Sequence, residues 1–242
     1  MKGFILMLTF LTRIPIKYTF SFNSDDFVKG IKYMPFIGLL IGGCLFPVSY
    51  FGDNIVPSIL SLLVIILYLI ITGGLHLDGL ADVSDGIFSY RDRDKIFEIM
   101  KDSRIGSFGV ISLILYFISM VTIIGYNDPV TILLFPLVGR CFALLICSIS
   151  EYAKESGMGK EFVEKTKYSY VFFGFVLLFS LIIVFNKLLL IGAVSITGII
   201  IVFVNTSIRK KLGGITGDVI GMTIEFSQVI FLLSAYLLGI VA

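Results

Sequence analysis

Apolar residues fill long stretches of this chain, and polar residues gather in the segments between them. A helix needs about 20 residues to cross about 30 Å of hydrocarbon. Seven stretches reach this length, at residues 31–52, 55–75, 106–126, 129–150, 168–186, 187–205 and 217–241. The pattern predicts an all-α polytopic membrane protein with about seven transmembrane helices.

A shorter apolar stretch, residues 3–16, precedes the first of these windows and is interrupted by Arg13 and Pro15. Its length favours a re-entrant or interfacial segment over a membrane span. A cleaved signal peptide is not expected, because Arg13 breaks the apolar region and no small-x-small cleavage site follows.

The composition agrees with this pattern and excludes a soluble domain. Hydrophobic residues make up 57% of the chain and charged residues 15%, and the mean hydropathy is +1.01. A soluble domain of this size cannot bury so much apolar surface. Without a linker or repeat, residues 1–242 are expected to form a single integral membrane domain. The three cysteines lack paired spacing, so they are expected to be small buried apolar residues.

Lys and Arg residues predict which connections face the cytoplasm. Seventeen of the nineteen lie in residues 1–32, 76–105, 151–167 and 206–216. Every second connection is therefore basic, which under the positive-inside rule places the N-terminus in the cytoplasm and the C-terminus outside. The candidate chemistry described below falls on the same predicted cytoplasmic side.

Carboxylates and basic residues are concentrated in residues 73–109, between two apolar stretches. Asp78, Asp82 and Asp85 are spaced i, i+4, i+7, so a helix would project all three from one face. Neighbouring carboxylates repel one another unless a cation lies among them, and such oxygen ligands suit Mg²⁺ or Mn²⁺. A solvated helix face is the alternative, and the spacing alone leaves both open.

Basic side chains follow these carboxylates along the chain. Arg91, Arg93, Lys101 and Arg104 can bind phosphate oxygens. However, Arg91 and Arg93 alternate with acidic residues, which is typical of a solvated segment, and Arg104 with Asp102 could simply cap the next span. With the aspartates, the block predicts metal-dependent phosphate chemistry at a membrane surface.

Three other polar residues lie in or beside apolar stretches. His76, the only histidine, is either an interfacial side chain or a site residue. In the site it could contact phosphate or accept a proton, since the pKa of histidine lies near neutrality. Arg140 and Glu225 would lie about 15 Å and about 12 Å inside their spans. A charge at such depth costs about 2.5–3.5 kcal/mol or more. The two residues are expected to form a structural ion pair, to line a polar cavity, or both.

A glycine-rich turn precedes Asp218 at the start of the last apolar stretch. The carboxylate could simply interact favourably with the helix dipole. Alternatively, the turn cradles a phosphate and Asp218 is a further metal ligand.

Four segments together resemble the cobalamin synthase family, the adenosylcobinamide-GDP ribazoletransferases. They are HLDGLADVSDG (76–86), IMKDSRIGSFG (99–109), FLTRIP (10–15) and GGITGDVIG (213–221) followed by Glu225. They cover almost the whole chain in the order expected of that family. One departure is Met222, where the last motif of the family has a small residue.

The resemblance implies a Mg²⁺-dependent transferase that acts late in cobalamin (vitamin B12) biosynthesis. It would join adenosylcobinamide-GDP to α-ribazole, or to its 5′-phosphate, and yield adenosylcobalamin, or its 5′-phosphate, and GMP. The implied metal ligands are Asp78, Asp82, Asp85, Asp102 and Asp218, and the implied catalytic residues are His76, Asp82 and Asp85. The implied substrate-binding residues are Arg13, Arg91, Lys101, Ser103, Arg104, Arg140, Gly213, Gly214, Thr216 and Glu225.

The implied partners are the two substrates and the lipid bilayer of the cell (inner) membrane, with the active site facing the cytoplasm. No nucleic-acid partner is expected, and a homo-oligomer or association with other enzymes of the pathway is left open. Two alternatives remain. The D-x-x-D-G at 82–86 is shared with CDP-alcohol phosphotransferases, although Ser89 and Tyr90 replace the A-R of their motif. A vitamin-binding transporter subunit is supported by Arg140 and Glu225 alone.

Overall fold

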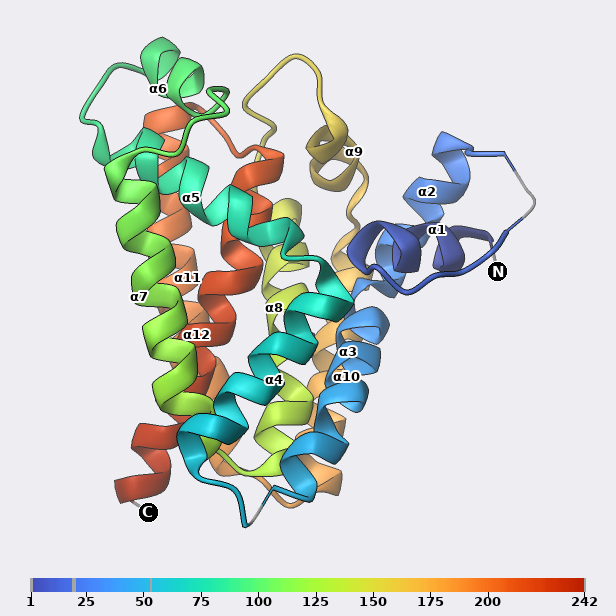
Figure 1. The fold of residues 1–242 in the computed structure, drawn as a ribbon. Coiled ribbons are helices and arrows are strands. Elements are labelled where there is room, and N and C mark those ends of the chain that lie inside the picture. The colour runs from blue at the N-terminus through green and yellow to red at the C-terminus, as the bar shows by residue number, and fades with distance from the viewer. Residues whose placement is uncertain (1, 19–20, 53, 242) are drawn as a thin grey trace.

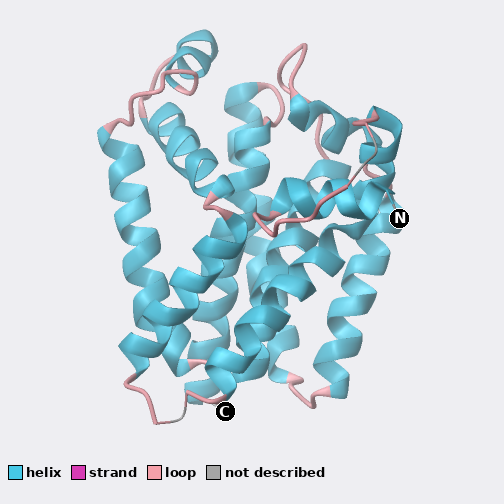
Figure 2. Cartoon of the chain, turned by 45° about the vertical axis from the view of Figure 1, so that its right-hand side comes forward, coloured by secondary structure: helices cyan, strands magenta, loops and turns pink. Residues whose placement is uncertain are grey.

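A computed structural model describes residues 2–18, 21–52 and 54–241, and Figures 1 and 2 show helices joined by short loops. The α-helices are α1 (Lys2–Leu11), α2 (Ser24–Gly30), α3 (Met34–Tyr50), α4 (Pro57–Thr72), α5 (Leu75–Phe88), α6 (Arg93–Ile99), α7 (Ser107–Ile123), α8 (Pro129–Ser148), α9 (Met158–Lys165), α10 (Tyr168–Val184), α11 (Leu189–Leu212) and α12 (Gly217–Val241). Short 3₁₀ turns, η1 (Ile31–Tyr33) and η2 (Ile124–Tyr126), precede α3 and follow α7.

The predicted all-α membrane architecture is confirmed. Within the described ranges, five helical segments are long and apolar enough to cross a membrane, and up to seven if each of two bent helix pairs counts as one span. The predicted windows contain α3, α4, α7, α8, α10 and α12 in full, and the window at 187–205 contains the first part of α11. Large apolar side chains also face outward: Phe172, Phe173, Ile199 and Phe203 are 63–73% exposed. Such surfaces are unfavourable in water and suit a lipid environment.

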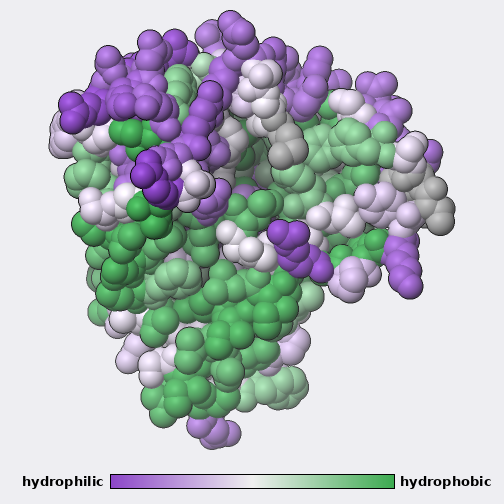
Figure 3. All heavy atoms as spheres, turned by 45° about the horizontal axis from the view of Figure 1, so that its top comes forward, coloured by the Kyte–Doolittle hydropathy of each residue, from purple (hydrophilic) through white to green (hydrophobic). Residues whose placement is uncertain are grey.

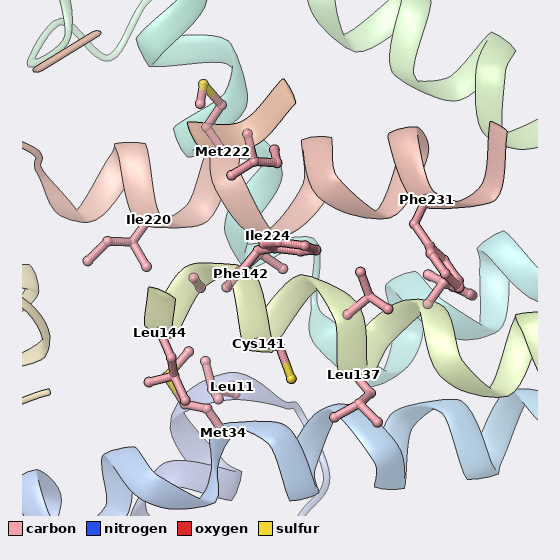
Figure 4. Packing of buried hydrophobic residues seen from close by; sticks show 14 of the residues in the cluster. Leu11, Met34, Leu137, Cys141, Phe142, Leu144, Ile220, Met222, Ile224 and Phe231 are labelled. Atoms are coloured by element: carbon pink, nitrogen blue, oxygen red, sulfur yellow. The ribbon is translucent and has the colours of Figure 1, made fainter. Parts of the chain in front are cut away.

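Helix α8 forms the centre of the molecule and packs against α3 on one side and α12 on the other (Figure 4). It is apolar almost all round, as expected of a buried helix, and its residues Leu137, Cys141 and Leu144 are completely buried. Phe231 of α12 is buried as well. Of the cysteines, Cys141 and Cys147 are buried as predicted, whereas Cys44 is exposed on α3. That prediction was wrong for Cys44, which lies on an outward-facing side of its helix.

Polar residues gather at one end of the molecule, above a predominantly hydrophobic body (Figure 3). This end carries the short helices α1, α2, α6 and α9 as well as α5 (Figure 1). The ten residues of α1 reach about 15 Å, too short to cross a bilayer, in agreement with the prediction for residues 3–16. The helix packs against α2 and η1 through the ring pairs Phe10–Phe27 and Phe4–Tyr33.

Helix α5 departs from the direction of α4 by 96°. The bend lies at Gly73 and Gly74, whose φ angles of +67° and +64° are left-handed and strain any residue with a Cβ. The Gly73 amide donates to the Leu69 carbonyl at 2.7 Å and closes the last turn of α4. As a result, α5 runs across the polar end, where it packs against α7 and α12.

Candidate active site

Three aspartates form an acidic cluster where α5 crosses the start of α12. Asp78 and Asp82 lie one turn apart on α5, and Asp218 is in the first turn of α12. The helices approach closely at Gly79, where a Cβ atom would lie only 2.6 Å from the backbone oxygen of Asp218. A side chain there would force the helices apart, so Gly79 brings the carboxylates of two distant segments together.

The charge in this cluster is poorly compensated. The pKa of Asp82 is raised to about 7, mainly because burial disfavours its charged form and further because Asp78, Asp218 and Asp85 are nearby. Lys154 opposes this rise, and its Nζ lies 3.7 Å from Asp218 Oδ2. A site in which several carboxylates compete for one lysine is suited to a cation.

Asp85 is directed to a different partner, the start of α7. Its carboxylate accepts hydrogen bonds from the amides of Gly106 (2.7 Å) and Gly109 (2.8 Å), and the side chain is buried. Gly106 is the N-cap residue of α7 and Gly109 lies in its first turn, where backbone N–H groups lack partners within the helix. These two hydrogen bonds explain why a carboxylate is buried here without a metal ion. The predicted roles of Asp85 as metal ligand and base stay predictions.

Loop contacts hold the turn before α12 and bring Lys154 to the acidic cluster. Ile215 donates to the Glu151 carbonyl at 2.8 Å, and its own carbonyl accepts from Ala153 at 2.9 Å. Arg93 donates to the carbonyls of Leu212 (2.7 Å) and Ala153 (2.8 Å). Sequence reasoning missed Lys154 and treated Arg93 as part of a solvated segment. The positive-inside pattern, which placed both loops on one side, was the only available signal.

A cavity of about 290 Å³ lies next to the acidic cluster. Its polar lining consists of His76, Asp78 and Asp218, and the remainder consists of apolar residues and glycines. Those residues are Phe10, Leu11, Met34, Leu75, Gly79, Gly159, Phe162, Gly217, Ile220, Gly221 and Ile224. The cavity is therefore mostly apolar, and the carboxylate cluster lies along one side of it.

Behind His76, a hydrogen-bond network is enclosed among the helices. Glu225 is 1% exposed, and its two carboxylate oxygens accept hydrogen bonds from the hydroxyls of Tyr68 (2.8 Å) and Tyr116 (2.6 Å). Gln228 donates to the Tyr68 hydroxyl at 3.1 Å. Glu225 Oε1 also lies 3.5 Å from His76 Nδ1. This contact is not a hydrogen bond, because His76 Nδ1 has no hydrogen-bond partner among the described residues. His76 also lines the cavity.

Arg140 is completely buried on α8, and its Nη1 donates to the Pro136 carbonyl at 3.2 Å. Its Nε and Nη2 have no hydrogen-bond partner among the residues that the structure describes. Among the described side chains, the basic residue within 4 Å of the Glu225 carboxylate is His76 and not Arg140. Neither Arg140 nor Glu225 lines the cavity. The predicted direct ion pair is therefore wrong, and the roles of Arg140 and Glu225 in substrate binding stay predictions.

The remaining predicted residues lie at the same polar end but outside the cavity. Arg13 is beside the α4–α5 bend, and its amide donates to the Ile71 carbonyl at 2.6 Å. Asp102 and Arg104 are exposed and pair with each other at 2.6 Å, which lowers the pKa of Asp102 to about 2. Arg91, Lys101 and Ser103 are exposed. Gly213 and Gly214 form the turn before α12, and Thr216 donates to Asp218 Oδ2 at 3.2 Å.

The donor set fits Mg²⁺ in chemistry but does not form a closed cage. In the part of the chain that the structure describes, no three His, Cys, Asp or Glu side chains are arranged to hold a metal ion together. Mg²⁺ is usually bound by one or two carboxylates, with water and substrate phosphates as its other ligands. Asp78, Asp82 and Asp218 supply such oxygens next to a cavity, so an open site completed by substrate is compatible with them.

A larger apolar groove of about 470 Å³ lies on the other face of α5, between α7, α11 and α12. Leu80, Val83 and Ile87 of α5 line it, and none of the clustered aspartates does. The helical repeat explains this division, because these residues lie opposite Asp78 and Asp82. Helix α5 therefore separates an acidic polar face from an apolar one.

Comparison with known proteins gives a consistent result over nearly the whole chain. The model of the family described as cobalamin-5-phosphate synthase matches residues 3–236. The chain is similar to proteins named adenosylcobinamide-GDP ribazoletransferase from Alkaliphilus oremlandii (44% identical, covering 98% of each chain), Fusobacterium nucleatum (37%, 96% of each) and Clostridioides difficile (36%, 98% of each). No solved structure matches this chain.

Proposed function

The chain belongs to the cobalamin-5-phosphate synthase family, a transferase family of late cobalamin biosynthesis, and from this premise we propose its substrates. We infer that it joins adenosylcobinamide-GDP to α-ribazole, or to α-ribazole 5′-phosphate, and releases GMP. The names of the relatives support this proposal. Neither a CDP-alcohol phosphotransferase nor a transporter subunit gains support from the comparisons.

The acidic cluster is the observation that carries the proposed mechanism. In it, Asp78, Asp82 and Asp218 would hold Mg²⁺, and the bound ion would neutralise charge on the pyrophosphate of adenosylcobinamide-GDP. Lys154 lies beside Asp218 and is placed to attract the same phosphates. Asp85 is left out of the ligand set because backbone amides already occupy both of its oxygens.

In the proposed reaction, a ribose hydroxyl of α-ribazole attacks the phosphorus that carries cobinamide. The new O–P bond forms as the pyrophosphate bridge to GMP breaks. Because α-ribazole 5′-phosphate would keep its phosphate in the product, the attacking oxygen is not the one at C5′. His76 lines the cavity and is the proposed acceptor of the hydroxyl proton. Glu225, 3.5 Å from Nδ1, would orient the imidazole and stabilise its protonated form.

We propose that the polar end faces the cytoplasm of the cell membrane. The contacts of Arg93, Ala153 and Ile215 support a common side for three basic segments, and the positive-inside rule assigns that side to the cytoplasm. Both Mg²⁺ and the GTP-derived substrate are available in the cytoplasm.

Turnover by the purified full-length chain tests this function. Protein in detergent is incubated with adenosylcobinamide-GDP, α-ribazole and Mg²⁺, and cobalamin and GMP are quantified by chromatography. Equimolar formation of both, dependent on both substrates, is expected. Failure to consume adenosylcobinamide-GDP, together with turnover of a CDP-alcohol, would overturn the proposal.

A further inference from the structure

The cavity beside the acidic cluster has a small polar part and a larger apolar part. His76, Asp78 and Asp218 provide its polar lining, and most of the other lining side chains are apolar. Within the described part of the chain, no Lys or Arg lines it. A phosphate group would gain no basic partner inside this chamber. A guanine would leave its hydrogen-bonding groups without partners against the apolar walls, which is costly. The lining therefore favours a neutral apolar ring, with a polar group directed toward the carboxylates.

The volume of the cavity further limits which part of a substrate can bind in it. Pockets for small molecules commonly measure about 300–1,000 Å³, and this cavity, at about 290 Å³, lies at the small end of that range. A corrinoid macrocycle with its amide side chains is far larger than such a chamber. Among the parts of the two proposed substrates, the base of the nucleoside is the one that is both small and apolar.

Two aromatic residues, Phe10 and Phe162, form part of the apolar wall of the cavity. Phe10 of α1 stacks on Phe162 of α9, with ring centroids 5.7 Å apart and an angle of 30° between the rings. Phe27 of α2 lies edge-on to both rings, at 5.3 and 5.6 Å. Phe10 and Phe162 line the cavity, and aromatic side chains pack favourably against a planar ring. The three rings also give α1, α2 and α9, which carry none of the clustered aspartates, a role in the site.

We propose that this cavity binds the neutral bicyclic base of α-ribazole and directs the ribose toward His76, Asp78 and Asp218. This assignment rests on the function proposed above, and it adds which substrate enters the cavity and through which surface. Adenosylcobinamide-GDP then approaches the acidic cluster from outside the cavity. The attacking hydroxyl and the phosphorus meet at the cavity mouth.

Gly217 offers a way to narrow the cavity without disturbing the fold. It lines the cavity at the start of α12, and an added Cβ would meet its nearest atoms, in Gly159, at 3.8 and 3.9 Å. Gly217→Ala therefore adds a methyl group at ordinary contact distance. Gly239→Ala is the matched control, because it makes the same change on the same helix where a Cβ meets nothing within 4 Å. Phe162→Ala removes part of the aromatic wall.

Steady-state kinetics with each substrate varied in turn tests the assignment. For Gly217→Ala and Phe162→Ala, the KM for α-ribazole should rise about tenfold, equivalent to about 1.4 kcal/mol. The KM for adenosylcobinamide-GDP should stay within about twofold, and Gly239→Ala should change neither. Equal rises for both substrates, or a rise for adenosylcobinamide-GDP alone, would overturn the assignment. Should Phe162→Ala fail to fold, Gly217→Ala decides.

Equilibrium binding of α-ribazole, measured by calorimetry on the same proteins, separates failure of this assignment from failure of the proposed function. If the unaltered protein binds α-ribazole, Gly217→Ala weakens that binding and no product forms, the reaction is wrong and the cavity assignment stands. If product forms but Gly217→Ala binds α-ribazole as well as Gly239→Ala does, the assignment is wrong and the reaction stands. If the unaltered protein neither binds α-ribazole nor turns over, both are wrong.

Discussion

Glu225 Oε1 lies 3.5 Å from Nδ1 of His76, so a carboxylate enclosed by the helices faces the chain's one histidine. Two tyrosine hydroxyls fix the carboxylate on its other sides. His76 in turn lines the cavity beside Asp78. This arrangement links a buried charge to the candidate site through a single imidazole.

Glu225→Gln is expected to lower kcat about tenfold to a hundredfold, with little change in either KM. The amide is similar in shape and can still contact both tyrosines, but it stabilises a protonated imidazole less. If Glu225 acts through His76, adding Glu225→Gln to His76→Gln should cause no further loss of kcat. Independent, multiplicative losses would show that Glu225 acts by another route.

Asp85 is expected to matter for stability through its cap on α7. Asp85→Ala leaves the amides of Gly106 and Gly109 without their acceptor and should lower the unfolding free energy by about 1–3 kcal/mol. Asp85→Asn keeps one acceptor oxygen and should lose less. Thermal unfolding in detergent measures both. Unchanged stability of Asp85→Ala, accompanied by complete loss of turnover, would favour a ligand or base role instead.

The raised pKa of Asp82 predicts a pH-dependent effect of Mg²⁺ on stability. Between its ordinary pKa, near 4, and about 7, Asp82 is protonated in the folded protein and ionised in the unfolded chain. The folded state therefore binds more protons, and without metal its stability should fall as pH rises across this window and then level off. Because Mg²⁺ binds the ionised form, the difference in Tm between Mg²⁺ and EDTA should grow over the same window.

Asp82→Asn should remove most of this pH dependence. The control is Asp94→Asn, which should retain it, because Asp94 is exposed in the first turn of α6. A Tm difference between Mg²⁺ and EDTA that is the same at pH 5 and pH 8, or the same in Asp82→Asn, would argue against a cation among these carboxylates.

The alternation of basic loops predicts that the C-terminus lies outside the cell. A periplasmic or extracellular reporter fused after Ala242 should be active, and a fusion within the loop between α6 and α7 should not. If the reporter were active in both fusions, both positions would lie outside the cell. An odd number of the predicted spans between them would then not cross the membrane.

Much of the fold was predictable because each spanning helix coincides with a continuous stretch of apolar residues in the sequence. The windows identified α3, α4, α7, α8, α10, α11 and α12, although the window at 187–205 ended before the charged last turn of α11. That turn was missed because Lys and Arg can extend from a helix end toward water, so hydropathy underestimates the helix.

The candidate site was only partly predictable, because its geometry depends on contacts between distant segments. Helical spacing correctly placed Asp78 and Asp82 on one face but could not show that Asp85 would meet the start of α7. Lys154 reaches Asp218 through backbone pairing between two loops, for which no sequence pattern exists. The tyrosine partners of Glu225 were missed for the same reason, since they belong to α4 and α7.

Initial rates over a Mg²⁺ titration test most directly the proposal that the acidic cluster holds Mg²⁺ while adenosylcobinamide-GDP is joined to α-ribazole. The unaltered protein and Asp94→Asn should form cobalamin and GMP with the same Mg²⁺ dependence, and neither should work in EDTA. Asp82→Asn should retain its fold and lose at least about a hundredfold in rate. Near-normal rates for Asp82→Asn at saturating Mg²⁺, or full activity in EDTA, would contradict the claim.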